Sequence, residues 1–316
     1  MNIVFFGTSH FARRHLAYLI AHQVKVSAVV TRPDRPKGRA LKIAPPPVKE
    51  YLREEAPEIP LFQPEKASTH ECIEVIKNFS PDLFVVVAYG EILKKELLDV
   101  PKRGAINVHA SLLPKYRGAD PIRRCLMNGE KESGVTIIEM AEKMDAGQMI
   151  RVGRVVIPET MTFKELEEEL CKIACPLLLE VIADIERENI QLIPQSEKEV
   201  TLAPKIREEE QQIHWERSAK ELHNLIRALS PTPGAWCWIK LEKEIKRMKI
   251  LRSLVVDEEE RGSFGEILLF DPKKGWIVSC ERGALKLLEL QLEGKKVMSA
   301  EELLRGLHSR IIQMVR

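Results

Sequence analysis

The chain has 316 residues, more than one domain usually holds, so we expect about two domains, each with its own hydrophobic core. A hydrophobic content of 44% and a charged content of 30% are typical of a soluble globular protein and exclude a disordered or fibrous one. No stretch approaches the roughly 18 apolar residues that a membrane helix needs. The opening residues, Met1 to Gly7, lack the charged leader of a signal peptide and predict a first β-strand.

The six cysteines indicate a reducing compartment. They are scattered, with no Cys-x-x-Cys pair and no histidine at metal-ligand spacing. Cys171 and Cys175 stand four residues apart on a predicted helix, where free cysteine usually packs as a small hydrophobic residue. We therefore expect reduced thiols, no bound metal and a cytoplasmic location.

The net charge of +2 hides an uneven distribution. Residues 1–50 carry nine Lys/Arg against two Asp/Glu, residues 51–200 carry 19 against 27, and residues 201–316 carry 21 against 18. A basic first segment and a mildly basic last third suit a polyanionic partner that contacts both ends of the chain.

Residues 1–190 predict a doubly wound, mostly parallel, Rossmann-like α/β domain. Apolar runs alternate with helical patterns, and the expected strands are Asn2 to Phe6, Lys25 to Thr31, Leu83 to Ala88, Gly104 to His109 and Gly134 to Met140. The second, third and fifth are nearly continuous Val/Ile/Leu runs, typical of strands buried on both faces of a parallel sheet. Helices are expected between them, from Phe11 to His22 up to a last one from Phe163 to about Glu188. That last helix opens with a capping box, Thr162-x-x-Glu165, and contains Pro176, which should kink or split it.

A smaller C-terminal domain is expected over residues 206–316, joined by a linker at 191–205 that contains Pro194 and Pro204. It begins with a helix from Ser218 to Leu229 and ends with one capped by Ser299-x-x-Glu302. Five short strand-like stretches lie between them, at 235–241, 244–256, 264–271, 275–281 and 284–292. Turns at this spacing predict a small β-barrel of the oligonucleotide-binding (OB) type.

The turn after the first strand excludes two kinds of nucleotide chemistry. It reads Gly7-Thr-Ser-His-Phe11, with a single glycine where a dinucleotide fingerprint needs three, so a nicotinamide or flavin site is disfavoured. The chain also lacks a Gly-x-x-x-x-Gly-Lys-Ser/Thr loop, so ATP chemistry of the P-loop kind has no support.

The densest chemical signal is the segment Asn107-Val-His-Ala-Ser-Leu-Leu-Pro114. Side chains two apart on a strand share a face, so Asn107 and His109 should project together at its carboxyl end, where open α/β sheets bind ligands. Taken alone, such a pair is more often a solvated strand end. Asp145 lies in a loop after the next expected strand, and Gly147 permits a turn there. No Gly-x-Ser-x-Gly elbow accompanies these residues, and a Ser-His-Asp reading through Ser111 would leave Asn107 without a role.

These motifs resemble those of the folate-dependent formyltransferases. The shared signature is Asn-x-His, then Ser-Leu-Leu-Pro, then Asp-x-Gly, present here as Asn107/His109, Ser111 to Pro114 and Asp145/Gly147. The resemblance runs from the first strand to Gly306. Further matching segments are Thr31 to Arg39, Pro47 to Lys49, Val87 to Gly90, Tyr116 to Ile122, Ile226 to Ala235 and Met298 to Ala300. Two departures are His214 and Gln148, where the family commonly has Asp.

The resemblance implies formyl transfer from 10-formyltetrahydrofolate, a co-substrate, to the amino group of methionyl initiator tRNA. Asn107 and protonated His109 would hydrogen-bond the oxyanion of the tetrahedral intermediate. Asp145 would pair with His109 and order a water that carries the proton between the two nitrogens. The folate is expected to contact Val87, Ala88, Tyr89, Gly90, Ser111, Leu112, Leu113 and Pro114.

The basic stretch from Arg32 to Lys42 resembles the family's tRNA-contacting insertion, although most such runs are merely solvated loops. We expect Arg35, Lys37, Arg39 and Lys42 to grip the acceptor stem through phosphates and groove edges. In the second domain six Lys/Arg fall between residues 240 and 252, and Lys246 and Arg247 are the expected contacts there. The enzyme is expected to be a monomer with no membrane partner.

Two alternatives remain open from the residues alone. The same chemistry could act on an amino-sugar nucleotide, against which the basic loop argues. The chain could also be a non-catalytic RNA-binding protein with a degenerate enzyme domain, which the intact Asn107, His109 and Asp145 disfavour.

Overall fold

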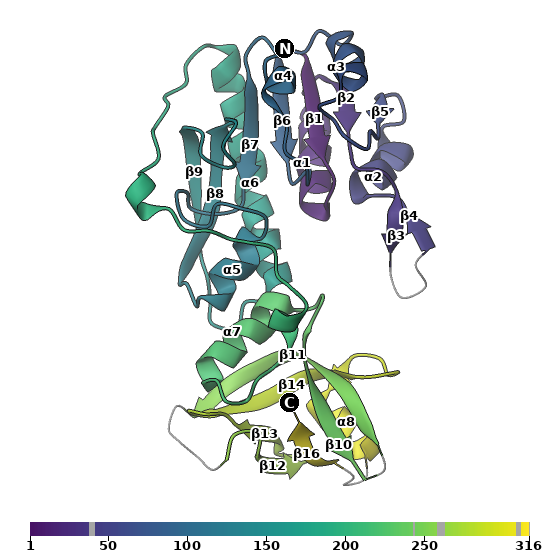
Figure 1. Cartoon of the computed structure of the whole chain (residues 1–316), viewed down its shortest axis with the longest axis vertical. Coiled ribbons are helices and arrows are strands. Elements are labelled where there is room, and N and C mark those ends of the chain that lie inside the picture. Colours follow the sequence, from purple (N-terminus) through teal and green to yellow (C-terminus); the bar gives the residue numbers. More distant parts are fainter. Residues whose placement is uncertain (38–41, 243, 258–262, 308–310, 316) are drawn as a thin grey trace. The chain divides into compact units, whose positions relative to one another are not determined.

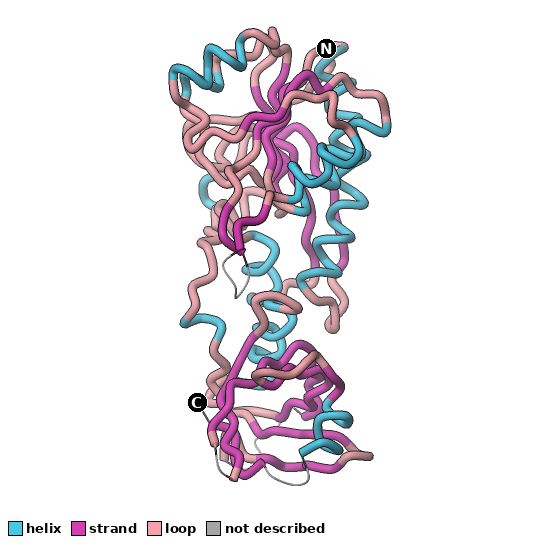
Figure 2. The backbone as a smooth tube through the Cα atoms, turned by 90° about the vertical axis from the view of Figure 1, so that its right-hand side faces the viewer, coloured by secondary structure: helices cyan, strands magenta, loops and turns pink. Residues whose placement is uncertain are grey.

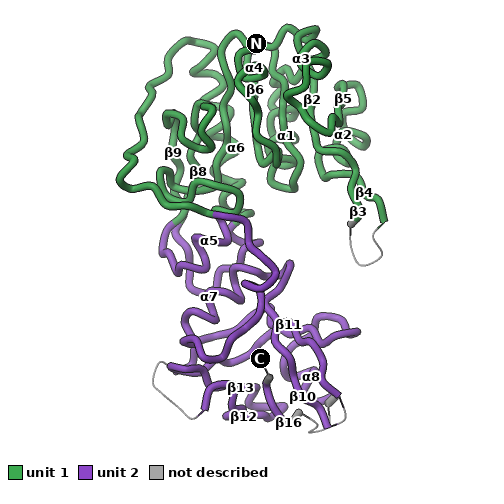
Figure 3. The backbone as a smooth tube through the Cα atoms, viewed as in Figure 1, with its two compact units in different colours: residues 1–121, 133–155, 167–203 green, residues 122–132, 156–166, 204–316 purple. Residues whose placement is uncertain are grey.

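The computed structural model describes residues 1–37, 42–242, 244–257, 263–307 and 311–315. Within these ranges the chain forms two compact units (Figure 3). The α/β unit comprises residues 1–121, 133–155 and 167–203, and the barrel unit comprises residues 122–132, 156–166 and 204–316. None of the described helices is long and apolar enough to cross a membrane.

A seven-stranded sheet forms the centre of the α/β unit, in the order β5-β2-β1-β6-β7-β8-β9 (Figure 1). Its strands are β1 (Ile3–Gly7), β2 (Val26–Val30), β5 (Leu61–Phe62), β6 (Leu83–Val87), β7 (Ala105–His109), β8 (Glu132–Glu139) and β9 (Met149–Val156). β1 pairs in parallel with β2 and β6, and β6 pairs in parallel with β7. Every residue of β1 and β6 is buried, and Figure 2 shows helices on both sides of the sheet. The predicted mostly parallel α/β domain is confirmed.

Strand β8 differs from the expectation in its direction. The run from Gly134 to Met140 predicts a parallel strand, but β8 is antiparallel to β7, with His109 opposite Thr136. Most of β8 is buried, so its apolar run correctly predicts a strand covered on both faces. Burial says nothing about direction. The chain enters β8 near the point where β7 ends, so β8 runs back along β7. Strand β9, whose residues alternate between exposed and covered, has no counterpart among the expected strands.

The described helices before residue 190 are α1 (His10–Ala21), α2 (Pro47–Glu55), α3 (His70–Lys77), α4 (Lys95–Leu98), α5 (Pro121–Met127) and α6 (Phe163–Glu186). The expected capping box of α6 is present, since Thr162 N donates to Glu165 Oε2 at 2.8 Å and Glu165 N to Thr162 Oγ1 at 3.5 Å. The helix runs on through Pro176, so the expected split is wrong. Leu170 and Leu178, on either side of the proline, are fully buried. Burying such a side chain contributes about 1.5–3 kcal/mol, which offsets the roughly 3 kcal/mol cost of an interior proline.

The barrel unit contains a nearly closed antiparallel β-barrel, in the order β12-β13-β14-β11-β10-β16 with β15 paired to β14. Its strands are β10 (Ala235–Leu241), β11 (Ile245–Asp257), β12 (Ile267–Asp271), β13 (Gly275–Ser279), β14 (Ala284–Leu292), β15 (Met298–Ser299) and β16 (Ile311–Val315). All five expected strands are present, and the predicted barrel is confirmed. β15 and β16 were not anticipated, since the first is very short and the second follows the expected final helix.

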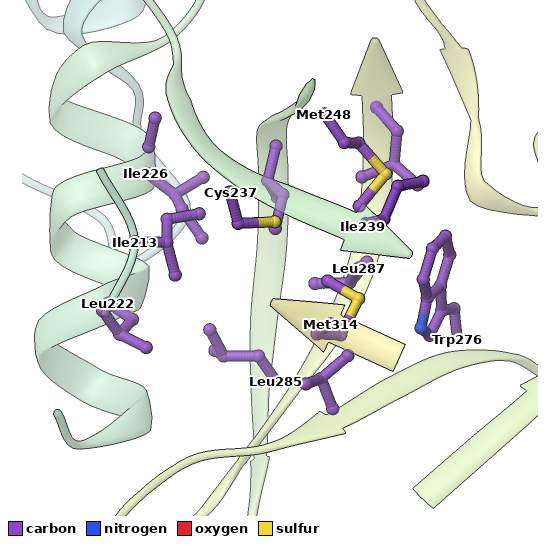
Figure 4. Packing of buried hydrophobic residues seen from close by; sticks show 14 of the residues in the cluster. Ile213, Leu222, Ile226, Cys237, Ile239, Met248, Trp276, Leu285, Leu287 and Met314 are labelled. Atoms are coloured by element: carbon purple, nitrogen blue, oxygen red, sulfur yellow. The ribbon is translucent and has the colours of Figure 1, made fainter. Parts of the chain in front are cut away.

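Large apolar side chains from the strands and from α7 (Ala219–Leu229) fill the barrel unit (Figure 4). Trp276 and Leu287 are fully buried, and Leu222 and Ile226, one helical turn apart on α7, belong to the same cluster. The Ser218 capping box at the start of α7 is present, as is the Ser299/Glu302 box of α8 (Ala300–Leu307). Both helix starts therefore lie where the capping patterns predict them.

Candidate active site

The end of β7 and the loop after β8 bring together Asn107, His109 and Asp145. Asn107 and His109 project from the same face of β7 because they are two residues apart. Asn107 Nδ2 donates to Asp145 Oδ1 at 3.3 Å, and His109 Nδ1 lies 3.5 Å from the same oxygen. The side chains of His109 and Asp145 are only 6% and 10% exposed, so water screens their interaction little. An amide, an imidazole and a carboxylate thus meet at one edge of the sheet.

Asp145 is held by its surroundings in a costly backbone conformation. Its φ is 52°, in the left-handed region that residues with a Cβ rarely adopt. Its Oδ2 atom accepts a hydrogen bond from the backbone nitrogen of Gly118 at 2.8 Å. Two residues further on, a Cβ at Gly147 would lie 1.8 Å from the carbonyl oxygen of Glu139, so only glycine lets the loop return this close to β8. The loop backbone therefore sets where the carboxylate lies.

His109 has an acceptor beside each ring nitrogen. Its Nε2 lies 2.9 Å from the carbonyl oxygen of Tyr116, which can only accept, so Nε2 carries a proton and donates it. Its Nδ1 faces Asp145. Asn107, by contrast, has a second amide N–H for which the described residues show no partner. Of the two expected oxyanion donors, Asn107 is thus ready as it stands, whereas the Nε2–H of His109 must first leave Tyr116.

The turn from Ser111 to Pro114 follows β7 and is fastened to β8. Leu113 N donates to Thr136 Oγ1 at 3.1 Å, and that hydroxyl donates to the carbonyl oxygen of Ser111 at 2.7 Å. Ser111 and Leu113 are buried, whereas Leu112 and Pro114 are half-buried. Two of these four expected folate contacts therefore support the turn, and the other two keep accessible apolar surface.

The other expected folate contacts, Val87 to Gly90, lie where β6 ends beside β7. Val87 and Tyr89 are buried, and burial raises the pKa of the Tyr89 hydroxyl, which stays protonated. Ala88 and Gly90 are exposed and have left-handed φ values of 43° and 86°. The accessible part of this turn is therefore Ala88 and Gly90, which have little or no side chain to cover their backbone groups.

Strands β3 (Arg35–Lys37) and β4 (Lys42–Ala44) form the hairpin that carries the expected tRNA contacts. Arg35 and Lys42 are exposed, Lys37 ends β3, and Arg39 lies outside the described residues. Arg35 Nη2 lies 2.5 Å from Glu65 Oε2, with the two side chains 58% and 71% exposed. One expected tRNA contact is therefore already engaged in a surface ion pair.

The base of this hairpin is anchored by Asp34. Lys49 Nζ donates to both carboxylate oxygens of Asp34 at 2.8 Å, and Gln63 Nε2 donates to Oδ1 at 2.8 Å. Hydrogen bonds from Gln63 and then Lys49 lower the pKa of Asp34, which keeps it ionised. The basic segment thus starts from a fixed point in the α/β unit.

In the barrel unit, Lys246 and Arg247 lie on β11, opposite Ile239 and Trp238 of β10. Lys246 Nζ lies 2.6 Å from Glu244 Oε1. The Arg247 guanidinium stacks over the Trp236 ring at 4.0 Å from its centroid. The cation–π contact holds the Arg247 side chain against β10.

Sequence patterns alone did not single out Tyr116, Gly118 and Gln195 as parts of the site. Tyr116 and Gly118 fall within the Tyr116-to-Ile122 motif, so the resemblance could have indicated them. Gln195 donates to the carbonyl oxygens of Asp145 and Gly147 at 2.8 and 2.7 Å. It lies in the aperiodic segment expected to be a linker, where no local signal marks it.

Comparison with known proteins identifies the family of this chain. Residues 1–182 match the formyl transferase family, and residues 205–308 match the formyl transferase C-terminal domain. The chain therefore belongs to the formyl transferase family. It is 48% identical over 308 residues to the methionyl-tRNA formyltransferase of Protochlamydia amoebophila, a match that covers 97% of this chain and 95% of that protein. Similarity over nearly the full length places it in the methionyl-tRNA formyltransferase branch of the family.

Solved structures share the fold at low identity. HypX from Aquifex aeolicus in complex with tetrahydrofolic acid is 17% identical with a TM-score of 0.64; the match covers 99% of this chain and 50% of HypX, so this chain spans about half of that protein. The N-formyltransferase from Helicobacter canadensis in complex with folinic acid and dTDP-3-aminofucose is 19% identical with a TM-score of 0.63, covering 90% of this chain and 98% of that one. These two similarities concern the fold alone.

Proposed function

We propose that this chain transfers the formyl group of 10-formyltetrahydrofolate to the amino group of methionyl initiator tRNA in the cytosol, for use in translation initiation. The observation that carries the proposal is the meeting of Asn107 and His109 at Asp145 Oδ1, at 3.3 and 3.5 Å. The 48% identity to a methionyl-tRNA formyltransferase over nearly the whole chain supports the choice of acceptor.

Formyl transfer forms one carbon–nitrogen bond and breaks another. The amine nitrogen of the acceptor attacks the formyl carbon, whose oxygen takes up negative charge, and the bond from that carbon to the folate N10 then breaks. The amine loses one proton and N10 gains one. The site must therefore stabilise an oxyanion and carry a proton between two nitrogens.

We assign the oxyanion to Asn107 and His109. The second N–H of Asn107 is available, and a preorganised donor of this kind contributes about 3 kcal/mol to transition-state stabilisation. The Nε2–H of His109 joins it once substrate displaces the carbonyl of Tyr116, 2.9 Å away. Asp145, beside His109 Nδ1, orders the water that takes the proton from the amine and delivers it to N10.

We assign the pteridine ring of the folate to the accessible surface at the ends of β6 and β7. Leu112 and Pro114 offer half-buried apolar surface on which such a ring packs. Ala88 and Gly90 offer exposed backbone groups for its polar edge. The buried members of the same two turns, including Ser111 and Leu113, hold these groups in place.

We assign tRNA binding to two basic regions. Arg35, Lys37, Arg39 and Lys42 would contact the acceptor stem, and Lys246 and Arg247 of the barrel would contact the tRNA body. Contacts from such cations go mostly to phosphates and depend strongly on salt. In this division residues 1–190 carry catalysis, residues 206–316 bind tRNA, and residues 191–205 connect them.

A formylation assay with 10-formyltetrahydrofolate and methionyl-tRNA tests the proposal. We expect rapid transfer to initiator methionyl-tRNA and much slower transfer to the elongator form. No transfer with both substrates saturating would overturn the proposal. Transfer to an amino-sugar nucleotide but not to tRNA would instead support the alternative acceptor. Light scattering after size-exclusion chromatography checks the expected monomer.

A further inference from the structure

A single amide side chain, that of Gln195, connects the Asp145 loop to a neighbouring segment. Its Nε2 donates to the carbonyl oxygens of Asp145 and Gly147 at 2.8 and 2.7 Å. Its Oε1 accepts from Arg117 Nε at 2.9 Å. Both hydrogens of the amide group therefore bond the Asp145 loop, and its oxygen bonds Arg117.

The loop needs such support because it holds a strained residue. Asp145 has a φ of 52°, and left-handed backbone at a residue with a Cβ persists only where the surroundings impose it. The two carbonyl groups that flank Ala146 are both bonded to Gln195, so the amide clamps the turn on either side of one residue. Losing these bonds would let Asp145 relax toward an ordinary conformation and carry its carboxylate away from His109.

Arg117, which anchors Gln195, is itself buried and hydrogen-bonded through its side chain and its backbone. Arg117 is 3% exposed, and its Nη2 donates to Glu197 Oε1 at 2.9 Å. Its backbone pairs with the segment after Gln195, donating to the carbonyl of Thr201 at 2.9 Å and accepting from Ala203 N at 2.7 Å. The residue after Arg117, Gly118, is the one whose nitrogen bonds Asp145 Oδ2. One short stretch therefore fixes both the backbone and the carboxylate of Asp145.

We propose that Gln195 is a positioning residue for formyl transfer, which acts by donating to the Asp145 loop and so keeping the Asp145 carboxylate beside Asn107 and His109. The inference rests on the proposed function of those three residues. Donation is the decisive property, because a glutamate at 195 could still accept from Arg117 but could not donate to either carbonyl.

Two substitutions separate donation from charge. Gln195→Glu removes the donors, adds a charge and keeps the acceptor for Arg117; Gln195→Met removes the hydrogen bonds without adding a charge. Both should lower kcat by about 100-fold, because a misplacement of about 1 Å in a catalytic group has an effect of that size. KM for either substrate should change less than about threefold. The matched controls are Gln148→Glu and Gln148→Met, on the same loop but exposed, which should stay within about twofold of the unsubstituted chain.

The outcomes distinguish the inference from the function on which it rests. If the unsubstituted chain does not formylate methionyl-tRNA, the proposed function fails. If that chain is active but the Gln195 variants have the same kcat as the Gln148 variants, the positioning role fails. The role also fails if Gln195→Met keeps full activity while Gln195→Glu loses it, because the added charge would then account for the loss.

A double-mutant cycle with Asp145→Asn separates positioning from a general loss of folding. If Gln195 acts through Asp145, Gln195→Met should lower kcat much less in the Asp145→Asn background than alone. Equal losses in the two backgrounds would show that Gln195 acts elsewhere and would overturn the inference. The thermal unfolding midpoint of each variant should fall by about 10 °C at most, the size of effect expected for Gln195→Met, which loses three hydrogen bonds.

Discussion

The proposed catalytic centre and the β3–β4 hairpin differ in how their charges are exposed to water. Asp145 is 10% exposed, and Asn107 Nδ2, His109 Nδ1 and Gly118 N all lie within 3.5 Å of its carboxylate oxygens. Arg35 is 58% exposed and pairs with one similarly exposed carboxylate. Buried charges act through their position because little water screens them, whereas exposed charges act through an attraction that salt weakens. Substitutions in the first region should change turnover, and those in the second should change tRNA binding.

The largest effect is expected from His109→Ala. Losing this oxyanion donor, the partner of Asp145, should lower kcat by about 1,000-fold. The dissociation constant for tRNA should change less than about threefold, since His109 is buried and is not one of the basic residues proposed to contact tRNA. Single-turnover kinetics and filter binding measure the two quantities. A variant that turns over normally, or that loses tRNA binding and turnover in parallel, contradicts the separation of the two regions.

Gly147→Ala tests the backbone side of the catalytic centre without removing a functional group. The new Cβ would lie 1.8 Å from the carbonyl oxygen of Glu139, so the loop must move. We expect kcat to fall by about 100-fold, because the Asp145 carboxylate moves with the loop. Gly306→Ala, at a helical position with open space around it, is the control and should have no effect on kcat. Full activity of Gly147→Ala would show that the loop tolerates displacement.

The Arg124–Glu210 pair in the barrel unit tests whether burial determines how much an ion pair contributes to the free energy of unfolding. Its side chains are 17% and 23% exposed, and hydrogen bonds from Arg124 lower the pKa of Glu210 from 4.5 to about 2. The ionised form therefore stabilises the fold above pH 4.5, and this stabilisation is lost as the pH falls toward 2.

Glu210→Gln should accordingly lower the free energy of unfolding by about 1–2 kcal/mol at neutral pH, a figure discounted for partial exposure. The difference from the unsubstituted chain should shrink as the pH drops below 4.5. Glu244→Gln, at a side chain that is 52% exposed, is the control and should change stability by less than about 0.5 kcal/mol. Denaturant titrations over this pH range measure both. A pH-independent difference would show that packing, not charge, accounts for the effect.

The smallest effect is expected at Glu65. Because Glu65 pairs with Arg35 on the surface, it would compete with tRNA phosphate for that guanidinium if Arg35 binds tRNA as proposed. Glu65→Gln should tighten tRNA binding by about two- to fivefold at low salt, and the gain should fade as salt rises. Arg35→Ala should weaken binding by a similar factor. If Glu65→Gln weakens binding instead, the ion pair holds Arg35 in its productive position.

Local patterns predicted most of the fold. Capping boxes at Thr162, Ser218 and Ser299 correctly marked helix starts, since a cap depends on residues only three apart. The direction of β8 could not be predicted from the sequence, because a strand with both faces covered has the same apolar composition whichever way it runs. The continuity of α6 through Pro176 depends on tertiary burial of leucines on either side, which a local rule ignores.

The same distinction applies to the candidate site. Asn107 and His109 could be placed on one face because side chains alternate along a strand. Asp145 could be identified from its Asp-x-Gly motif. Gln195 could not, since its partners Arg117, Asp145 and Gly147 are at least 48 residues away along the chain. The engagement of His109 Nε2 with Tyr116 was equally hidden, because it depends on the left-handed turn at Tyr116.

The pairing of Arg117 with the segment up to Ala203 has a consequence for how the protein becomes active during its synthesis. A nascent chain that has emerged as far as residue 190 already contains Asn107, His109 and Asp145. It still lacks Gln195, which bonds the Asp145 loop, and the segment that pairs with Arg117. Formyl transfer should therefore not begin before the ribosome has released the stretch through Ala203.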